Sequence, residues 1–319
     1  MARSGKIRIG VSGWTYAGWR GTFYPRGLPR QRELGYAAAH FTAVEINGTF
    51  YGLQRPAAFR AWAAEVPDDF VFAVKGSRYI THMLKLKGIE AALANFLASG
   101  PLALGEKLGP ILWQFPPMLR FDPERFEAIF RMLPHDTLAV ARLAARHDHR
   151  LRASPCLDPW PVRPVRHAVE IRHESFRDAA FVALLRRHGI ALVAADSVDW
   201  PLLMDLTADF VYCRLHGSVE LYNSAYSEAE LDRWAGRIRA WSAGKPMTDG
   251  EFVTAPVRDR RRRDVFLFFD NTDKLMAPNN AKGLMRRLGI VTEEQDRGQN
   301  QDRHRRVGVR GLAGRRVLP

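Results

Sequence analysis

Eight short apolar runs, rich in β-branched residues, recur along this chain of 319 residues. Most neighbouring runs are separated by a segment whose apolar residues have helical spacing. Repeated strand–helix units favour a parallel sheet with right-handed crossovers. The runs are Ile7–Val11, Ala43–Asn47, Phe70–Lys75, Pro110–Phe115, Ala168–Arg172, Ile190–Ala195, Phe210–Leu215 and Val265–Phe269.

Eight such units favour an α/β fold in which the sheet closes into a (β/α)8 barrel of the TIM type, with parallel strands inside and helices outside. An open, doubly wound sheet is the alternative. Capping signals mark the helices between the strands. Asp122 is a good N-cap before Pro123. Ser227 and Glu230 form a capping box, and Gly289 follows a last turn that holds two arginines.

The length predicts one barrel domain over residues 1–291, because barrels of this type commonly use about 250 residues. Residues 141–166 are rich in Arg, His and Pro, and we interpret them as an insertion before the fifth strand. From residue 292 the apolar periodicity is lost, so 292–319 is predicted to be a basic flexible tail. The apolar runs are too short to span a bilayer and no signal-peptide core is present, which predicts a cytoplasmic protein without membrane contact.

The two cysteines, Cys156 and Cys213, lie far apart without the close spacing of zinc or redox motifs. This argues against a disulfide framework and against a cysteine-rich metal site. The formal net charge of +14 is compatible with an anionic partner such as nucleic acid or a phosphorylated substrate. A basic loop, Arg258–Arg263, and the arginines of the tail are the segments that would contact nucleic acid.

Polar side chains gather where the predicted strands end, which is the active face of a closed parallel barrel. Residues two apart on a strand face the same way, so Glu170 pairs with Arg172 and Arg214 with His216. This rule selects Glu45, Glu170, Asp196 and His216 as candidate catalytic residues. It selects as candidate substrate-binding residues Asn47, Lys75, Gln114, Arg172, Arg214 and Asn271. His82, from the loop after the third strand that suits an anionic group, and the aromatic residues Trp14 and Tyr51 of the adjoining loops are added.

The charges in this set balance, with three acidic and three basic strand-end residues. Such a set suits general acid–base chemistry on a small anionic substrate. The alternative is a buried polar layer whose charges only satisfy one another. The carboxylates and His216 could also ligate a divalent metal, but three nearby cations disfavour it and no HExxH spacing is present. No metal site is therefore assigned, a divalent metal is possible but not favoured, and the cofactor is unknown.

Several motifs in this chain resemble one family. They are GVSGW at 10–14, GTFYP at 21–25, VEIN at 44–47, FAVK at 72–75, QFPP at 114–117, VEIRHESF at 169–176, RLHG at 214–217 and FDN at 269–271. In combination they resemble the YecE-like family, domain of unknown function 72, over roughly residues 7–289. The resemblance implies a barrel related to the TIM type and places the charged candidates on signature positions of the family. It brings no assigned activity.

Three hypotheses of function follow. The first is an enzyme, in the hydrolase, lyase or isomerase range, in which Glu45 or Glu170 transfers protons with help from His216 and the basic residues hold a small anionic or phosphorylated substrate. The second is a nucleic-acid-binding or repair-nuclease-like barrel. The third is a barrel that binds a metabolite without converting it. The sequence does not define an oligomeric state.

Overall fold

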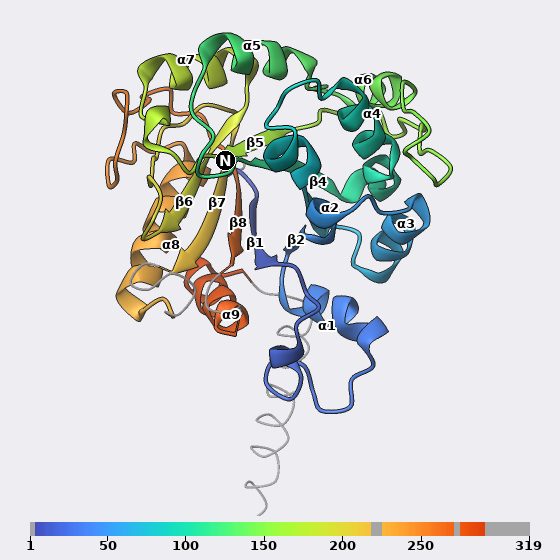
Figure 1. The fold of residues 1–319 in the computed structure, drawn as a ribbon. Coiled ribbons are helices and arrows are strands. Elements are labelled where there is room, and N and C mark those ends of the chain that lie inside the picture. The colour runs from blue at the N-terminus through green and yellow to red at the C-terminus, as the bar shows by residue number, and fades with distance from the viewer. Residues whose placement is uncertain (1–3, 218–224, 271–274, 291–319) are drawn as a thin grey trace, which may run out of the picture.

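The computed structural model describes residues 4–217, 225–270 and 275–290 of the chain. Eight parallel strands follow one another around a closed barrel, and β8 pairs with β1 to complete it (Figure 1). The predicted (β/α)8 barrel is confirmed. The strands are β1 (Ile7–Ser12), β2 (Ala43–Ile46), β3 (Val71–Lys75), β4 (Leu108–Gln114), β5 (His167–Glu170), β6 (Ala191–Ser197), β7 (Phe210–Gly217) and β8 (Asp264–Phe269).

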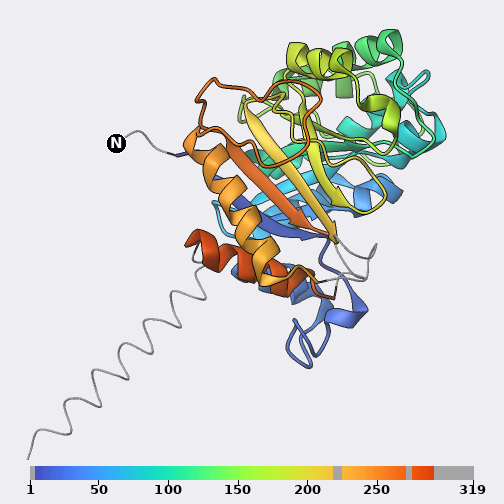
Figure 2. The same cartoon turned by 90° about the vertical axis from the view of Figure 1, so that its left-hand side faces the viewer.

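Helices surround the barrel on its outside. Figure 2 shows α8 and α9 side by side over the strands, and both helices contact β8. No helix in the described ranges is long and apolar enough to cross a membrane. The α-helices are α1 (Glu33–His40), α2 (Gly48–Tyr51), α3 (Pro56–Glu65), α4 (Glu90–Ala98), α5 (Pro123–Met132), α6 (Thr137–Ala144), α7 (Ala179–His188), α8 (Glu228–Ala243) and α9 (Ala277–Leu288).

The predicted capping signals define helix ends in the structure. The Asp122 carboxylate accepts a hydrogen bond from the backbone N–H of Arg125 at the start of α5. Ser227 and Glu230 form the complete capping box of α8. Gly289 closes α9 in the left-handed conformation, with φ +68°, which glycine adopts at little cost. The backbone in these segments therefore follows its local sequence.

The predicted insertion at 141–166 needs a correction at its start. Residues 141–144 belong to α6, whose N-cap Asp136 accepts a hydrogen bond from the backbone N–H of Ala139. This helix packs against α4 and so belongs to the outer layer of the barrel. The irregular connection to β5 begins only after Ala144. The predicted tail at 292–319 lies outside the described residues.

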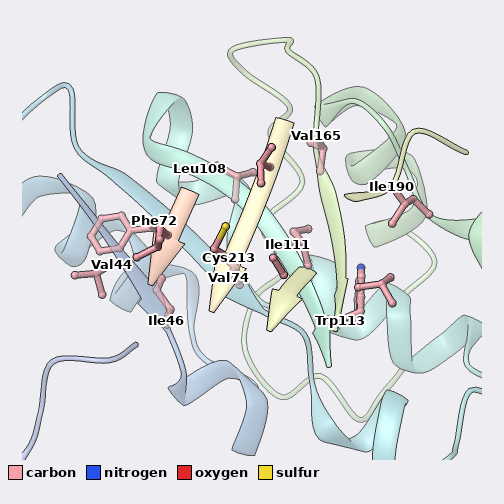
Figure 3. Close-up of a cluster of buried hydrophobic side chains, with 14 of the residues drawn as sticks. Val44, Ile46, Phe72, Val74, Leu108, Ile111, Trp113, Val165, Ile190 and Cys213 are labelled. Carbon is pink, nitrogen blue, oxygen red and sulfur yellow. The ribbon is translucent and has the colours of Figure 1, made fainter. Parts of the chain in front are cut away.

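The two faces of each strand fill two different spaces. The outward side chains pack between the sheet and the helices, and Figure 3 shows part of this layer, with Val44, Val74 and Cys213 among its labelled residues. Cys213 and Cys156 are both buried free thiols. The inward side chains fill the barrel: small ones on β2, β3 and β5 leave room for large rings on β7 and β8, such as Tyr212 and Phe268. Because side chains alternate, the next inward positions along each strand lie at its carboxyl end.

Candidate functional site

Arg214 lies at the centre of a buried charge cluster at the carboxyl ends of the strands. Its guanidinium donates hydrogen bonds to both carboxylate oxygens of Glu45, at 3.1 and 3.0 Å. It also donates to Glu170 at 2.6 Å and to Asp270 at 2.7 Å. Arg214 is fully buried, but these carboxylates raise its pKa further, so the side chain stays charged. One arginine on β7 thus joins β2, β5 and the end of β8.

The carboxylate of Glu45 accepts hydrogen bonds from three side chains. Besides Arg214, its carboxylate accepts hydrogen bonds from the Ser12 hydroxyl at 3.0 Å and from the Tyr212 hydroxyl at 2.6 Å. The pKa of Tyr212 is raised well above its usual value by burial and by the charge of Glu45, so its hydroxyl remains a donor. Glu45 has no exposed surface. It therefore lies beneath the opening and holds other groups in place.

Glu170 is held in a similar way at the carboxyl end of β5. Its Oε1 accepts hydrogen bonds from Gln114 Nε2 at 2.8 Å and from Arg172 Nε at 3.0 Å, while Oε2 faces Arg214. Burial alone would raise the pKa of Glu170, but the guanidinium groups of Arg214 and Arg172, together with His216, hold it well below its usual value. Glu170 is thus a buried carboxylate whose surroundings favour its charged form.

His216 and Trp200 form one side of the site. His216 Nε2 accepts a hydrogen bond from Arg214 at 3.3 Å, and its Nδ1 lies 3.4 Å from Asp270 Oδ2. The Trp200 ring lies edge-on to His216, with 5.3 Å between ring centroids. The guanidinium of Arg172 stacks over the same indole at 3.7 Å from the ring centroid. Trp200 comes from the β6–β7 connection and fixes the position of Arg172.

Lys75 and His82 form the opposite side. Lys75 Nζ lies 4.4 Å from the centroid of the Phe50 ring, and the side chain is 8% exposed. Burial, together with the charge of Arg214, lowers the pKa of Lys75 to about 8. The His82 ring lies edge-on to Phe50, and its Nδ1 is 2.8 Å from the Thr81 hydroxyl. Burial, with the charges of Arg172 and Lys75, lowers the pKa of His82 to about 4, so its imidazole is neutral.

Asn47 and the two predicted aromatic residues lie at the edge of this arrangement. Asn47 follows β2, and its buried Oδ1 has no hydrogen-bond partner among the residues that the structure describes. Tyr51 is 69% exposed, and the Arg78 guanidinium lies over its ring at 5.4 Å from the centroid. Trp14 instead packs edge-on against Trp62 of α3. Asn47 and Tyr51 are available to a ligand, whereas the Trp14 ring belongs to the loop packing.

The structure does not bring Asp196 into the cluster, so its prediction as a member was wrong. The inward positions of β6 are Val193 and Ala195, and alternation turns Asp196 outward. There its carboxylate accepts a hydrogen bond from Trp234 Nε1 of α8 at 3.1 Å. Burial raises the pKa of Asp196 in this position. Asn271, another predicted member, lies outside the described residues.

Sequence reasoning missed four residues of this site: Ser12, Tyr212, Trp200 and Asp270. Three of them obey the rule that found the others. Tyr212 lies two residues before Arg214, Asp270 two after the inward Phe268, and Ser12 is the inward residue at the end of β1. Trp200 had no such signal, because its position depends on the path of a connection.

The carboxylates of the cluster are committed to arginine rather than to a metal. Within the described part of the chain, no group of three or more His, Cys, Asp or Glu side chains is arranged to hold a metal ion. Glu45 and Glu170 direct their oxygens at Arg214. A cation placed among them would have to displace a guanidinium that is already bound.

A separate cavity of about 410 Å³ lies at the amino-terminal end of the barrel. Its charged lining is paired internally: Arg166 contacts Asp264 at 2.7 Å and Asp209 at 3.0 Å, and Arg8 contacts Asp69 at 3.4 Å. In barrels of this architecture the amino-terminal face serves stability, and the carboxyl-terminal face holds the chemistry. We therefore assign the candidate site to the Arg214 cluster and not to this cavity.

Comparison with known proteins identifies the family of this chain. A family model described as a protein of unknown function, DUF72, matches residues 8–305. The chain belongs to the DUF72 family. Two solved DUF72 family proteins share its fold. The one from Thermotoga maritima is 25% identical, with a TM-score of 0.66 over 89% of this chain and 99% of that one. The one from Enterococcus faecalis is 17% identical, with a TM-score of 0.60 over 91% and 100%.

Two curated relatives confirm the predicted resemblance to YecE-like proteins. The UPF0759 protein YunF of Bacillus subtilis is 32% identical over 116 residues, which cover 35% of this chain and 40% of YunF. The UPF0759 protein YecE of Escherichia coli is 30% identical over 128 residues, which cover 40% of this chain and 43% of YecE. The aligned part thus spans about two fifths of each relative. Neither name specifies a reaction.

Proposed function

We propose that this DUF72 protein is an enzyme that binds a small anionic substrate at the carboxyl ends of the strands and acts on it by general acid–base chemistry. The observation that carries the proposal is the Arg214 cluster. Burying one arginine with three carboxylates costs desolvation free energy, and an apolar filling of the barrel would often be as stable. A charge cluster at the active face of this fold is therefore better explained by a ligand than by stability alone.

Arg172, Lys75 and Asn47 are the groups that would bind the anion. Arg172 keeps 14% of its side chain exposed, whereas Arg214 is wholly enclosed and already bonded on all sides. Arg172 therefore retains capacity for a carboxylate or phosphate, the geometry that a guanidinium matches best. Arg214, which the sequence also suggested as a ligand, positions the carboxylates instead.

Proton transfer falls to groups nearer the opening than the two glutamates. Glu45 and Glu170 have no exposed surface, and their oxygens accept hydrogen bonds from several donors. They suit positioning roles better than the catalytic roles that the sequence suggested. Asp270, with 11% of its side chain exposed, is the more accessible carboxylate, and the adjacent buried His216 would be its partner in proton transfer.

Calorimetric titration with inorganic phosphate and with pyruvate tests the anion site. We expect saturable binding of at least one of them, and Arg172→Met should weaken it about ten-fold or more, as expected for loss of a charged hydrogen bond. Arg131→Met is the matched control, since Arg131 is an exposed arginine on α5. Absence of binding by both anions, or equal effects of the two variants, would reject the proposal.

A second candidate function, nucleic-acid binding, has support from one surface groove of about 520 Å³. Arg55, Arg60 and Arg152 line it, with no acidic residue among its lining. The basic loop proposed from the sequence is a weaker candidate, because Arg263 is buried and bonded to Asp259. The tail, its other candidate segment, lies outside the described residues.

Oligonucleotide binding tests this second function. Affinity should fall steeply with salt, because phosphate contacts release bound counterions. The double substitution Arg60→Glu with Arg152→Glu should abolish it, while phosphate titration at the barrel mouth stays unchanged. Affinity that is absent at low salt would exclude the function.

A further inference from the structure

We propose that Lys75 is a nucleophile that forms an imine with the carbonyl group of a small anionic ketone or aldehyde. This inference rests on the proposed function and names its substrate class. It assigns to Lys75 a covalent role in place of a purely electrostatic one.

The backbone around Lys75 is held firmly at the end of β3. The Thr49 hydroxyl donates a hydrogen bond to the Lys75 carbonyl at 2.6 Å. The next residue, Gly76, donates its N–H to the Leu112 carbonyl at 2.7 Å. A Cβ at Gly76 would lie 2.4 Å from the Trp113 ring, so only glycine fits there. These contacts position the lysine side chain without using its amine.

The amine itself is unusual among the groups of the cluster. The other strand-end charges are tied into the Arg214 network, but no carboxylate oxygen of a described residue lies within 4.0 Å of Lys75 Nζ. The amine lies instead over the face of the Phe50 ring. A buried amine without a salt bridge is easily deprotonated, and only the neutral amine is a nucleophile.

Lys107 is a partly buried lysine with a structural role in the same protein. Its Nζ donates hydrogen bonds to the Ala63 carbonyl at 2.7 Å and to the Val66 carbonyl at 2.8 Å. These bonds join η4 (Pro101–Lys107) to α3 and leave its charge satisfied. Among the residues that the structure describes, Lys75 Nζ has no equivalent carbonyl acceptors, so a role in holding this part of the fold does not account for it.

Imine formation needs no reactant other than the lysine amine, the carbonyl compound and water. The electron pair of the neutral amine attacks the carbonyl carbon, the C=O π bond breaks, and the proton that the nitrogen loses passes to the oxygen to give a neutral carbinolamine. That hydroxyl group takes up a second proton from solvent, the C–O bond breaks as water leaves, and the nitrogen electron pair forms the C=N bond of a protonated imine. The protonated imine withdraws electrons from a neighbouring C–H or C–C bond and so weakens it. A base such as Asp270 can then remove the proton. Hydrolysis by water later restores the amine, so no oxidant or reductant is consumed.

Borohydride trapping on the full chain tests the proposal directly. The protein is incubated with pyruvate or with dihydroxyacetone phosphate, and sodium borohydride then reduces any imine to a stable secondary amine. We expect the peptide that contains Lys75 to gain the mass of the ketone less one oxygen atom. Lys75→Met should abolish the adduct. Lys282→Met should retain it, because Lys282 lies over Phe23, outside the barrel, in a similar cation–π contact.

A second variant and a reactivity measurement complete the test. If Lys75→Met fails to fold, Lys75→Arg keeps the charge and removes the nucleophilic amine. Reductive methylation with formaldehyde and cyanoborohydride reports whether small carbonyl compounds reach Lys75. At pH 8, with a pKa of about 8, its neutral fraction is on the order of 100-fold greater than that of a lysine in water. Trapping by neither ketone overturns the proposal, whether or not formaldehyde reacts.

The result also separates this proposal from the proposed function. If no adduct forms but phosphate or pyruvate still binds and depends on Arg172, only the imine is rejected. If neither anion binds, the anion site itself is rejected.

Discussion

Arg214 connects several strand ends through ion pairs. It bonds to Glu45, Glu170 and Asp270, and each of these comes from a different strand end. Removing one partner from a buried ionic cluster leaves charges uncompensated, which costs far more than the intact cluster contributes. The same logic explains why both glutamates are fully enclosed while the more exposed groups, Arg172 and Asp270, face the opening.

Arg214→Met should lower the free energy of unfolding by about 3–5 kcal/mol, because three carboxylates lose their shared cation. Urea denaturation at pH 7 measures the change. Arg131→Met, at an exposed helix pair, should change it by less than about 1 kcal/mol. Equal stability of Arg214→Met and the unchanged protein would show that the cluster does not depend on this arginine.

The lowered pKa of Lys75 predicts that the free energy of unfolding depends on pH. Its pKa is lowered to about 8 in the folded state, whereas a lysine in the unfolded chain has a pKa of about 10.4. Between these values the unfolded state binds more protons, so stability should rise with pH by at most about 3 kcal/mol. Urea denaturation at pH 7.5 to 10.5 should show this contribution in the unchanged protein and its loss in Lys75→Met. Identical slopes in the two proteins would contradict the lowered pKa.

At the scale of secondary structure, the sequence predicts strands well and connections poorly. β-branched runs located all eight strands, and alternation along them also accounts for most of the site. Asp196 was predicted to join the cluster because it lies at a strand end. The alternation of side chains along β6 turns it outward, toward Trp234. The helix α6 was partly hidden in a segment interpreted by its basic composition. The position of Trp200 depends on the path of the β6–β7 connection, which no local pattern encodes.

That connection should matter for ligand binding because Trp200 fixes Arg172. Trp200→Ala removes a cation–π contact worth about 1 kcal/mol and should weaken phosphate or pyruvate binding about five-fold. Trp160→Ala is the matched control, since Trp160 is 76% exposed in the insertion. Calorimetry on both variants makes the comparison. A similar effect in both would mean that Trp200 does not orient the anion-binding arginine.

At the scale of the whole molecule, the barrel carries charge clusters at both ends with different roles. The amino-terminal cavity is lined by ion pairs that connect the starts of strands that are not adjacent in the barrel, such as those of Arg166, just before β5, with Asp264 of β8 and with Asp209, just before β7. The carboxyl-terminal cluster leaves Lys75 and Arg172 available at its edge. This division follows the architecture, in which loops at one end carry function and the other end secures the sheet.

Arg166→Met tests the division. The substitution should reduce the free energy of unfolding by about 1–3 kcal/mol, because the partly buried carboxylate of Asp264 loses its charged partner. Anion affinity and the reactivity of Lys75 should remain unchanged at 25 °C. A loss of anion binding in a variant that is still folded would show that the two ends are coupled.

The most direct test of the anion site is protection of Lys75 from reductive methylation. Formaldehyde and cyanoborohydride are applied at pH 8 with and without saturating phosphate, at matched ionic strength, and each lysine is quantified by mass spectrometry. A ligand bound between Arg172 and Lys75 should slow methylation of Lys75 and leave Lys282 unaffected. Equal rates at Lys75 with and without phosphate would contradict a site for this anion at the strand ends.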